Sequence, residues 1–173
     1  GVSVNIEEAS KYYKMAADNG QVDSMYHYGW QLLTGEGAQI NRVESARYFK
    51  MAADKGHLNA MYNYALMLQK GIDIPINLKE AAIYYKMAAD RGQIDAMNNY
   101  GLILENGNGV EVNKKEACRY YKDAADKGQI NAMFNFAWML LNGIGVSINK
   151  KESLYYFKMA ANQGHGEAAY WYA

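Results

Sequence analysis

The sequence predicts an all-α solenoid of antiparallel helix pairs, and two observations predict it. Near-copies of the stretch from Asn149 to Gly164 recur every 36 residues, starting at Asn5, Asn41, Asn77 and Asn113. Each copy also places apolar residues at helical spacing, as in Ala81, Tyr84, Tyr85, Ala88 and Ala89. A repeat of this length is typical of a solenoid, because one unit cannot bury its apolar face alone and must stack on its neighbours.

The residues at the ends of each copy predict where its helix starts and stops. Asparagine is a strong N-cap, and a glutamate follows it by three residues in every copy, which is the spacing of a capping box: Glu8, Glu44, Glu80, Glu116 and Glu152. A glycine then ends each helix in the left-handed conformation that glycine adopts most easily: Gly20, Gly56, Gly92, Gly128 and Gly164.

Four aspartates oppose the simple rules, because the last turn of a helix disfavours a negative charge: Asp18, Asp54, Asp90 and Asp126. Each follows a lysine by four residues, as Asp18 follows Lys14. An exposed lysine–aspartate pair explains this pattern, and so does a specific hydrogen bond to the start of the next helix. The sequence leaves both interpretations open.

Second helices are predicted between the copies, at about 22–34, 58–70, 94–106 and 130–142, with a further start near 166. Their expected N-caps are Asp23, Asn59, Asp95 and Asn131. The spacing of Ala60, Met61, Tyr64, Ala65 and Leu68 gives one of them an apolar packing stripe. Glycine-rich loops follow, and Asp73 takes a glycine position in one of them, so we expect positive φ there.

Composition narrows the class of protein. The chain has 173 residues and a net charge of zero, which gives no field that would attract nucleic acid or an anionic membrane. No apolar run is long enough to cross a bilayer. Cys118, the only cysteine, occupies a small buried slot, so we expect a structural thiol. An unpaired cysteine favours a reducing compartment and hence an intracellular, cytoplasmic location.

The ends of the sequence fall inside the repeat. Gly1–Asn5 matches the loop Gly145–Asn149, and Glu167–Ala173 matches the beginning of a second helix. We therefore expect residues 1–173 to form a single solenoid domain of four full helix pairs with partial units at both ends, cut from a longer array.

No catalytic, cofactor-binding or metal-binding residue is predicted. His57 and His165 hold the same slot three repeats apart, and therefore cannot share a metal with each other or with His27. No nucleophile stands with a base and an orienting group, and no cofactor is expected.

The segment Ala132–Val146, followed by Lys150-Lys-Glu, Tyr156, Lys158-Met-Ala-Ala and Gly164, resembles the Sel1-like repeat, a relative of the tetratricopeptide repeat. The resemblance covers the whole chain. It implies a right-handed α/α superhelix that acts as a non-catalytic scaffold or adaptor for a protein or peptide partner. It also implies an alternative, since hydrolase or antibiotic-binding activity is claimed for cysteine-rich relatives, although those carry paired cysteines in each repeat.

The expected partner surface is the face of the second helices opposite their packing stripe, which lines the concave side in related superhelices. Its members are Tyr26, His27, Trp30, Tyr62, Asn63, Leu66, Asn98, Asn99, Leu102, Phe134, Asn135 and Trp138. Asn63, Asn99 and Asn135 could bond an extended peptide backbone, with aromatic residues forming side-chain pockets. Alternatively, these residues pack on one another between repeats.

Two further partner predictions follow. Trp30 and Trp138 leave glycan binding open as another alternative. Exposed apolar ends, which include Tyr170, Trp171 and Tyr172, predict end-to-end self-association of the chain. No nucleic acid and no direct membrane insertion are expected.

Overall fold

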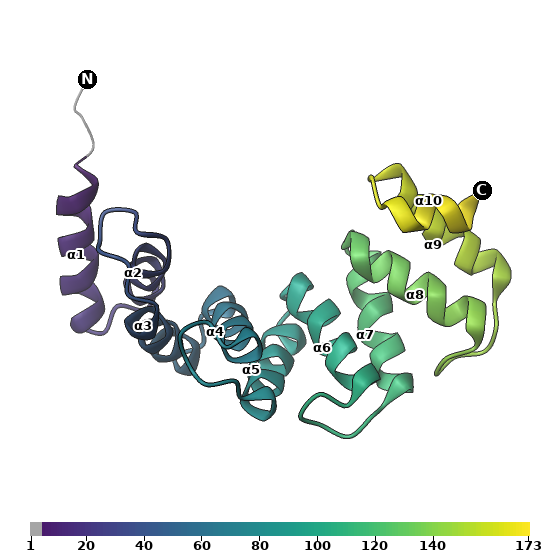
Figure 1. Cartoon of the computed structure of the whole chain (residues 1–173), viewed down its shortest axis with the longest axis horizontal. Coiled ribbons are helices and arrows are strands. Elements are labelled where there is room, and N and C mark those ends of the chain that lie inside the picture. Colours follow the sequence, from purple (N-terminus) through teal and green to yellow (C-terminus); the bar gives the residue numbers. More distant parts are fainter. Residues whose placement is uncertain (1–4) are drawn as a thin grey trace. The chain divides into compact units, whose positions relative to one another are not determined.

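The computed structural model describes residues 5–173, and within this range it contains ten α-helices and no strand (Figure 1). The expected loop at residues 1–4 lies outside the described residues. The chain divides into two compact units, residues 1–87 and 88–173, and each is described by itself.

The first unit holds α1 (Ile6–Asp18), α2 (Val22–Thr34), α3 (Arg42–Asp54), α4 (Leu58–Lys70) and most of α5 (Leu78–Asp90). The second holds the end of α5 and then α6 (Ile94–Asn106), α7 (Lys114–Asp126), α8 (Ile130–Asn142), α9 (Lys150–Asn162) and α10 (Gly166–Tyr172). These bounds confirm the predicted second helices.

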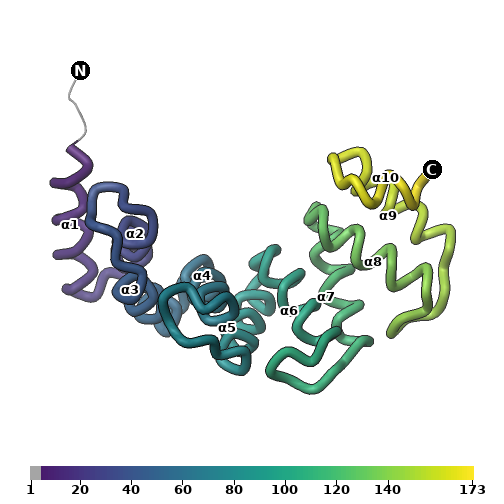
Figure 2. Tube along the Cα trace, in the orientation of Figure 1, coloured from purple at the N-terminus to yellow at the C-terminus, as the bar shows by residue number. Residues whose placement is uncertain are grey.

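Packing within each unit joins helices that are consecutive in the sequence, and Figure 2 lets the reader follow that order along the chain. In the first unit α2 packs on α1 and α3, and α3 packs on α4. In the second unit α7 packs on α6 and α8, and α9 packs on α8 and α10. None of the helices in the described part of the chain has the length and apolar character needed to cross a membrane.

The asparagine caps are confirmed, but the capping box differs from the expected one. Asn77 Oδ1 accepts from the Glu80 backbone N–H at 3.1 Å, and Glu80 accepts from Asn77 Nδ2 at 2.9 Å. The backbone N–H of Asn77 does not need the glutamate, because it donates to the carbonyl of Leu68 at 3.0 Å. Asn41, Asn113 and Asn149 make the same backbone bond, so the caps of α3, α5, α7 and α9 also tie each first helix to the end of the second helix before it.

The predicted caps of the second helices were wrong by two residues. The N-caps are Gln21, His57, Gln93, Gln129 and His165 rather than Asp23, Asn59, Asp95 and Asn131. His57 Nδ1 accepts from the Ala60 N–H at 3.1 Å, and Gln129 Oε1 accepts from the Ala132 N–H at 2.6 Å. Gln21 is the exception, because its side chain makes no capping hydrogen bond to the first turn.

The last-turn aspartates make a longer-range hydrogen bond, and Asp18, Asp54 and Asp126 also pair with a lysine four residues earlier. Asp18 accepts from Lys14 Nζ at 2.6 Å and from the Tyr48 hydroxyl, 30 residues ahead, at 2.6 Å. The same bond recurs in Asp54–Tyr84, Asp90–Tyr120 and Asp126–Tyr156, and we call these four pairs the tyrosine–aspartate ladder. The predicted partner at the start of the next helix was wrong: the bond from Asp18 skips α2 and goes to Tyr48 in the middle of α3.

The core follows the predicted stripe. Ala60, Met61, Tyr64, Ala65 and Leu68 are all buried. One aromatic from each of α2, α4, α6 and α8 also meets a ladder tyrosine edge to face, as Tyr28 meets Tyr48 with ring centroids 4.9 Å apart. The residue that follows the second-helix aromatic must also be small: a Cβ on Gly101 would lie 2.7 Å from Cε1 of Tyr121, the neighbour of the ladder tyrosine Tyr120.

Candidate functional site

In the first unit, the expected surface is partly open. Trp30 is 41% exposed and His27 is exposed, whereas Tyr62, Asn63 and Leu66 are half-buried. Tyr26 is also half-buried, because its ring stacks on His57 at a centroid distance of 4.4 Å. Aromatic packing between repeats therefore coexists here with an exposed tryptophan.

In the second unit, the asparagines bond to one another. Asn135 Nδ2 donates to Asn98 Oδ1 at 3.0 Å, and Asn98 is only 4% exposed. The expectation that Asn98 points into solvent was wrong, because a short amide in the slot of Tyr26, Tyr62 and Phe134 is covered by its surroundings. Asn99 and Leu102 are half-buried, as is Asn135.

A cavity of about 310 Å³ opens at the C-terminal side of this surface, and we call it the Trp138 cavity. Three of its lining residues belong to the predicted surface: Phe134, Asn135 and Trp138. The other three are Glu105 at the end of α6 and Glu167 and Trp171 in α10. Its volume falls within the usual range of small-ligand pockets.

The aromatic walls of the Trp138 cavity are held in place by ring contacts. Trp138 and Trp171 meet edge to face with centroids 5.1 Å apart and an interplanar angle of 72°. Trp171 also lies parallel to Phe157, and Phe134 stacks on His165 at 4.5 Å. The two indole rings thus form a corner rather than a closed stack.

On the acidic side of the Trp138 cavity, a buried tyrosine holds one of the two carboxylates by a hydrogen bond. Glu105 Oε2 accepts from the hydroxyl of the fully buried Tyr121 at 2.8 Å. Burial, together with the neighbouring Glu105 carboxylate, raises the pKa of Tyr121, so the phenol stays a hydrogen-bond donor. Glu167 is exposed at the rim.

Sequence reasoning missed Glu105, Glu167 and Trp171 as site residues. A signal was present, because Trp171 stands where the preceding repeats carry Asn135, Asn99 and Asn63.

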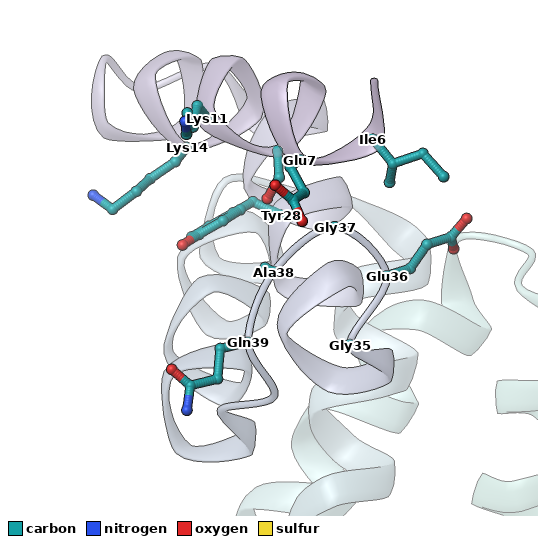
Figure 3. A pocket seen from close by; sticks show the side chains of 11 residues that line it. Ile6, Glu7, Lys11, Lys14, Tyr28, Gly35, Glu36, Gly37, Ala38 and Gln39 are labelled. Carbon is teal, nitrogen blue, oxygen red and sulfur yellow. The ribbon is translucent and has the colours of Figure 1, made fainter. Parts of the chain in front are cut away.

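A different pair of hollows lies in the first unit, lined by none of the predicted site residues. The larger has a volume of about 810 Å³ and lies between α1 and the loop that follows α2. Figure 3 shows its lining side chains, which include Glu7, Lys11, Lys14, Tyr28 and the loop residues from Gly35 to Gln39. A hollow of about 500 Å³ recurs one repeat later, with Val43, Arg47, Lys50 and Tyr64 in the corresponding positions. Because these hollows recur with the repeat, they reflect how a loop crosses a helix pair.

The groups with chemical potential lie apart. Cys118 is buried, and burial together with the charge of Glu152 raises its pKa to about 11. No group of three or more histidine, cysteine, aspartate or glutamate side chains suited to a metal occurs in residues 5–173.

Comparison with known proteins identifies the repeat. The Sel1 repeat family matches residues 1–21, 22–57, 58–93, 94–129 and 130–165. A Sel1 repeat protein from Oxalobacter formigenes is 30% identical, with a TM-score of 0.89 over 97% of this chain and 69% of the other. The protein c5321, a protective antigen of uropathogenic Escherichia coli with an SLR fold, is 26% identical with a TM-score of 0.87.

The match to the Escherichia coli protein covers 96% of this chain but only 35% of the length of that protein. Helicobacter pylori cysteine rich protein B shares the fold, at 23% identity and a TM-score of 0.58 over 76% of this chain and 96% of the other. No curated protein sequence matches the chain. The chain belongs to the Sel1 repeat family, whose fold generally mediates protein–protein interaction and is generally non-enzymatic.

Proposed function

We propose that this chain is a non-catalytic adaptor that binds a peptide or protein partner on the face of its second helices opposite their packing stripe, which is the expected concave surface. The observation that carries the proposal is the Trp138 cavity, because the predicted surface supplies three of its six lining residues. Exposed or half-buried aromatic side chains beside polar groups are typical of interaction hot spots. Trp30 offers a comparable anchor in the first unit.

A binding role fits the one cysteine better than a catalytic role does. The thiolate is the reactive form of cysteine, and a buried thiol with a pKa near 11 holds little of it at neutral pH. Cys118 also takes the slot of Ala46 and Ala82, both buried, which is the environment of a packing residue.

Selection of peptides on the immobilised chain tests the proposal. A phage-displayed random peptide library supplies ligands, and calorimetry then measures their affinity for the chain and for single variants. Trp30→Leu and Trp138→Leu remove the two anchors, and leucine is the residue this chain carries in the same slot at Leu66 and Leu102. Loss of one aromatic anchor typically weakens binding by about 2 kcal/mol, or roughly thirtyfold.

The matched control is Leu154→Ala, which truncates an exposed apolar side chain on α9, outside the proposed surface. We expect the selected peptides to keep their affinity for this variant. Peptides that bind both tryptophan variants normally and lose affinity for Leu154→Ala would place the partner surface elsewhere and reject the proposal.

A further inference from the structure

We propose that the Trp138 cavity binds the guanidinium group of an arginine side chain supplied by the partner. This inference rests on the proposed function, since it names the chemistry that the partner presents at one point of the surface. It goes further in assigning a charged ligand to a cavity that the repeat pattern alone does not predict.

The charge of the lining selects a cation. Glu105 and Glu167 contribute two carboxylates, and none of the described lining residues is lysine or arginine. Tyr121 occupies only one acceptor site of Glu105, and a carboxylate offers about four. A cationic side chain entering the cavity would therefore find unneutralised acceptors at two points.

The polar lining also offers acceptors in preference to donors. Asn135 uses one N–H of its Nδ2 to reach Asn98, which fixes the orientation of the amide and leaves Oδ1 and the second N–H for other partners. Together with the carboxylates of Glu105 and Glu167, this Oδ1 gives a set of oxygen acceptors. A guanidinium carries five N–H donors and no acceptor, so its hydrogen-bonding capacity is the complement of this set.

The aromatic lining suits a flat cation. Trp138 and Trp171 stand at 72° to each other, so a planar group can lie on the face of one ring while its edge meets the other. Guanidinium groups stack on aromatic faces, and tryptophan gives the strongest cation–π attraction of the aromatic residues. An ammonium group would gain the charge but not the stacking.

None of the preceding repeats combines the residues that give the cavity its character. Glu105, Trp138, Glu167 and Trp171 correspond, one repeat earlier, to Gln69, Leu102, Asn131 and Asn135. A cavity with those residues would have neither the carboxylates nor the indole corner. The sequence thus concentrates charge and aromatic surface at one place along the array.

The same comparison supplies variants that the fold already accommodates. Glu105→Gln, Trp138→Leu and Trp171→Asn each introduce a residue that this chain uses at the same slot in another repeat. The matched control is Trp30→Leu, which makes the same change as Trp138→Leu in a slot without the acidic pair. Far-ultraviolet circular dichroism of each variant checks that its helices are retained.

The experiment titrates the 173-residue chain with the acetylated and amidated peptide Gly-Arg-Gly and follows the tryptophan indole N–H signals by nuclear magnetic resonance. The chain has three tryptophans, so Trp30 serves as an internal reference. The comparison peptide carries citrulline, which keeps the shape of arginine and lacks its charge.

We expect the arginine peptide to shift the signals of Trp138 and Trp171 but not Trp30, with a Kd of about 1 mM that befits a single side chain. Citrulline should bind roughly fivefold more weakly, and Trp138→Leu and Glu105→Gln should each weaken arginine binding by about three- to tenfold. Trp30→Leu should leave the affinity unchanged, and raising the salt concentration should lower it.

Equal binding of citrulline and arginine, undiminished binding to Trp138→Leu and Glu105→Gln, or no shift up to about 20 mM peptide would each overturn the inference. Library peptides that lack arginine and still depend on Trp138 would reject the arginine assignment while leaving the proposed partner surface standing. Library peptides that depend on neither Trp30 nor Trp138 would reject the surface itself.

Discussion

Replacing Tyr48 by phenylalanine removes one bond of the tyrosine–aspartate ladder and leaves the ring in place. The hydroxyl of Tyr48 donates to Asp18 Oδ1 at 2.6 Å, and the rest of the residue is buried against Tyr28. Since phenylalanine keeps the edge-to-face contact, the change in the free energy of unfolding reports the hydrogen bond alone.

The size of the effect follows from the exposure of the acceptor. A hydrogen bond to a charged group contributes about 1.5–3 kcal/mol. The Asp18 side chain is 46% exposed, so water can replace part of the lost bond, and we expect a loss of about 1–1.5 kcal/mol. For a chain of this length that loss corresponds to a fall in Tm of about 2–6 °C, measured by calorimetry.

Tyr12→Phe is the matched control, because Tyr12 holds the same slot in α1 but is 63% exposed. It should change stability by less than about 0.5 kcal/mol. Asp18→Asn and the double variant complete a cycle that isolates the pair. A loss for Tyr48→Phe no greater than that for Tyr12→Phe, or a coupling energy near zero, would refute the reasoning.

Three other results are expected. Hydrogen bonds from Lys14 and Tyr48 lower the pKa of Asp18 below its ordinary 3.8, so the stability it provides is present above that pH and is lost as the pH falls below it. Urea titrations from pH 5 to about pH 2 should show a shallower loss in Asp18→Asn than in the unmodified chain. Gly128→Ala should lower the free energy of unfolding by about 1–2 kcal/mol in a thermal unfolding experiment, because φ is +94° at this residue although no atom lies within 4 Å of the added Cβ. Gly166→Ala is the control: its surroundings are equally open but it lies in a helix, so the free energy of unfolding should not fall. Cys118 should react with a thiol reagent at pH 8 only as fast as the chain unfolds, and reaction at the rate of a free thiol would contradict its burial.

The helix positions could be predicted from the sequence because the repeat places the same local signals five times. Asn77 and Glu80 lie three residues apart and meet in one turn, so their contact is a property of the local sequence. Asp73 takes its predicted positive φ, at 53°, for the same reason. The repeat pattern therefore predicts features that depend only on residues close in the sequence, such as helix ends, caps and turn conformation.

Contacts between helices were harder to predict. The recurrence of Asp18 showed that it has a specific role, but the distance of 30 residues to Tyr48 depends on how successive helix pairs pack. The caps at His57 and Gln129 were missed because asparagine and aspartate two residues later are stronger caps by propensity. The candidate surface could be predicted from which residues of a helix lie opposite its packing stripe. Its cavity could not, because it also requires Glu105 and Trp171, which come from different helices.

The ladder has a consequence for how such a chain changes length. Each bond joins residues 30 apart, while the pattern itself advances by 36, so excision of residues 42–77 would place Tyr84 at the same offset from Asp18 that Tyr48 holds now. Losing or gaining a whole number of periods leaves a phenol 30 residues after each carboxylate, whereas a deletion of another size inside the array changes that offset. The tyrosine–aspartate bonds therefore survive recombination between repeats but not a small insertion within one. Arrays of varied length can arise without new contacts having to evolve.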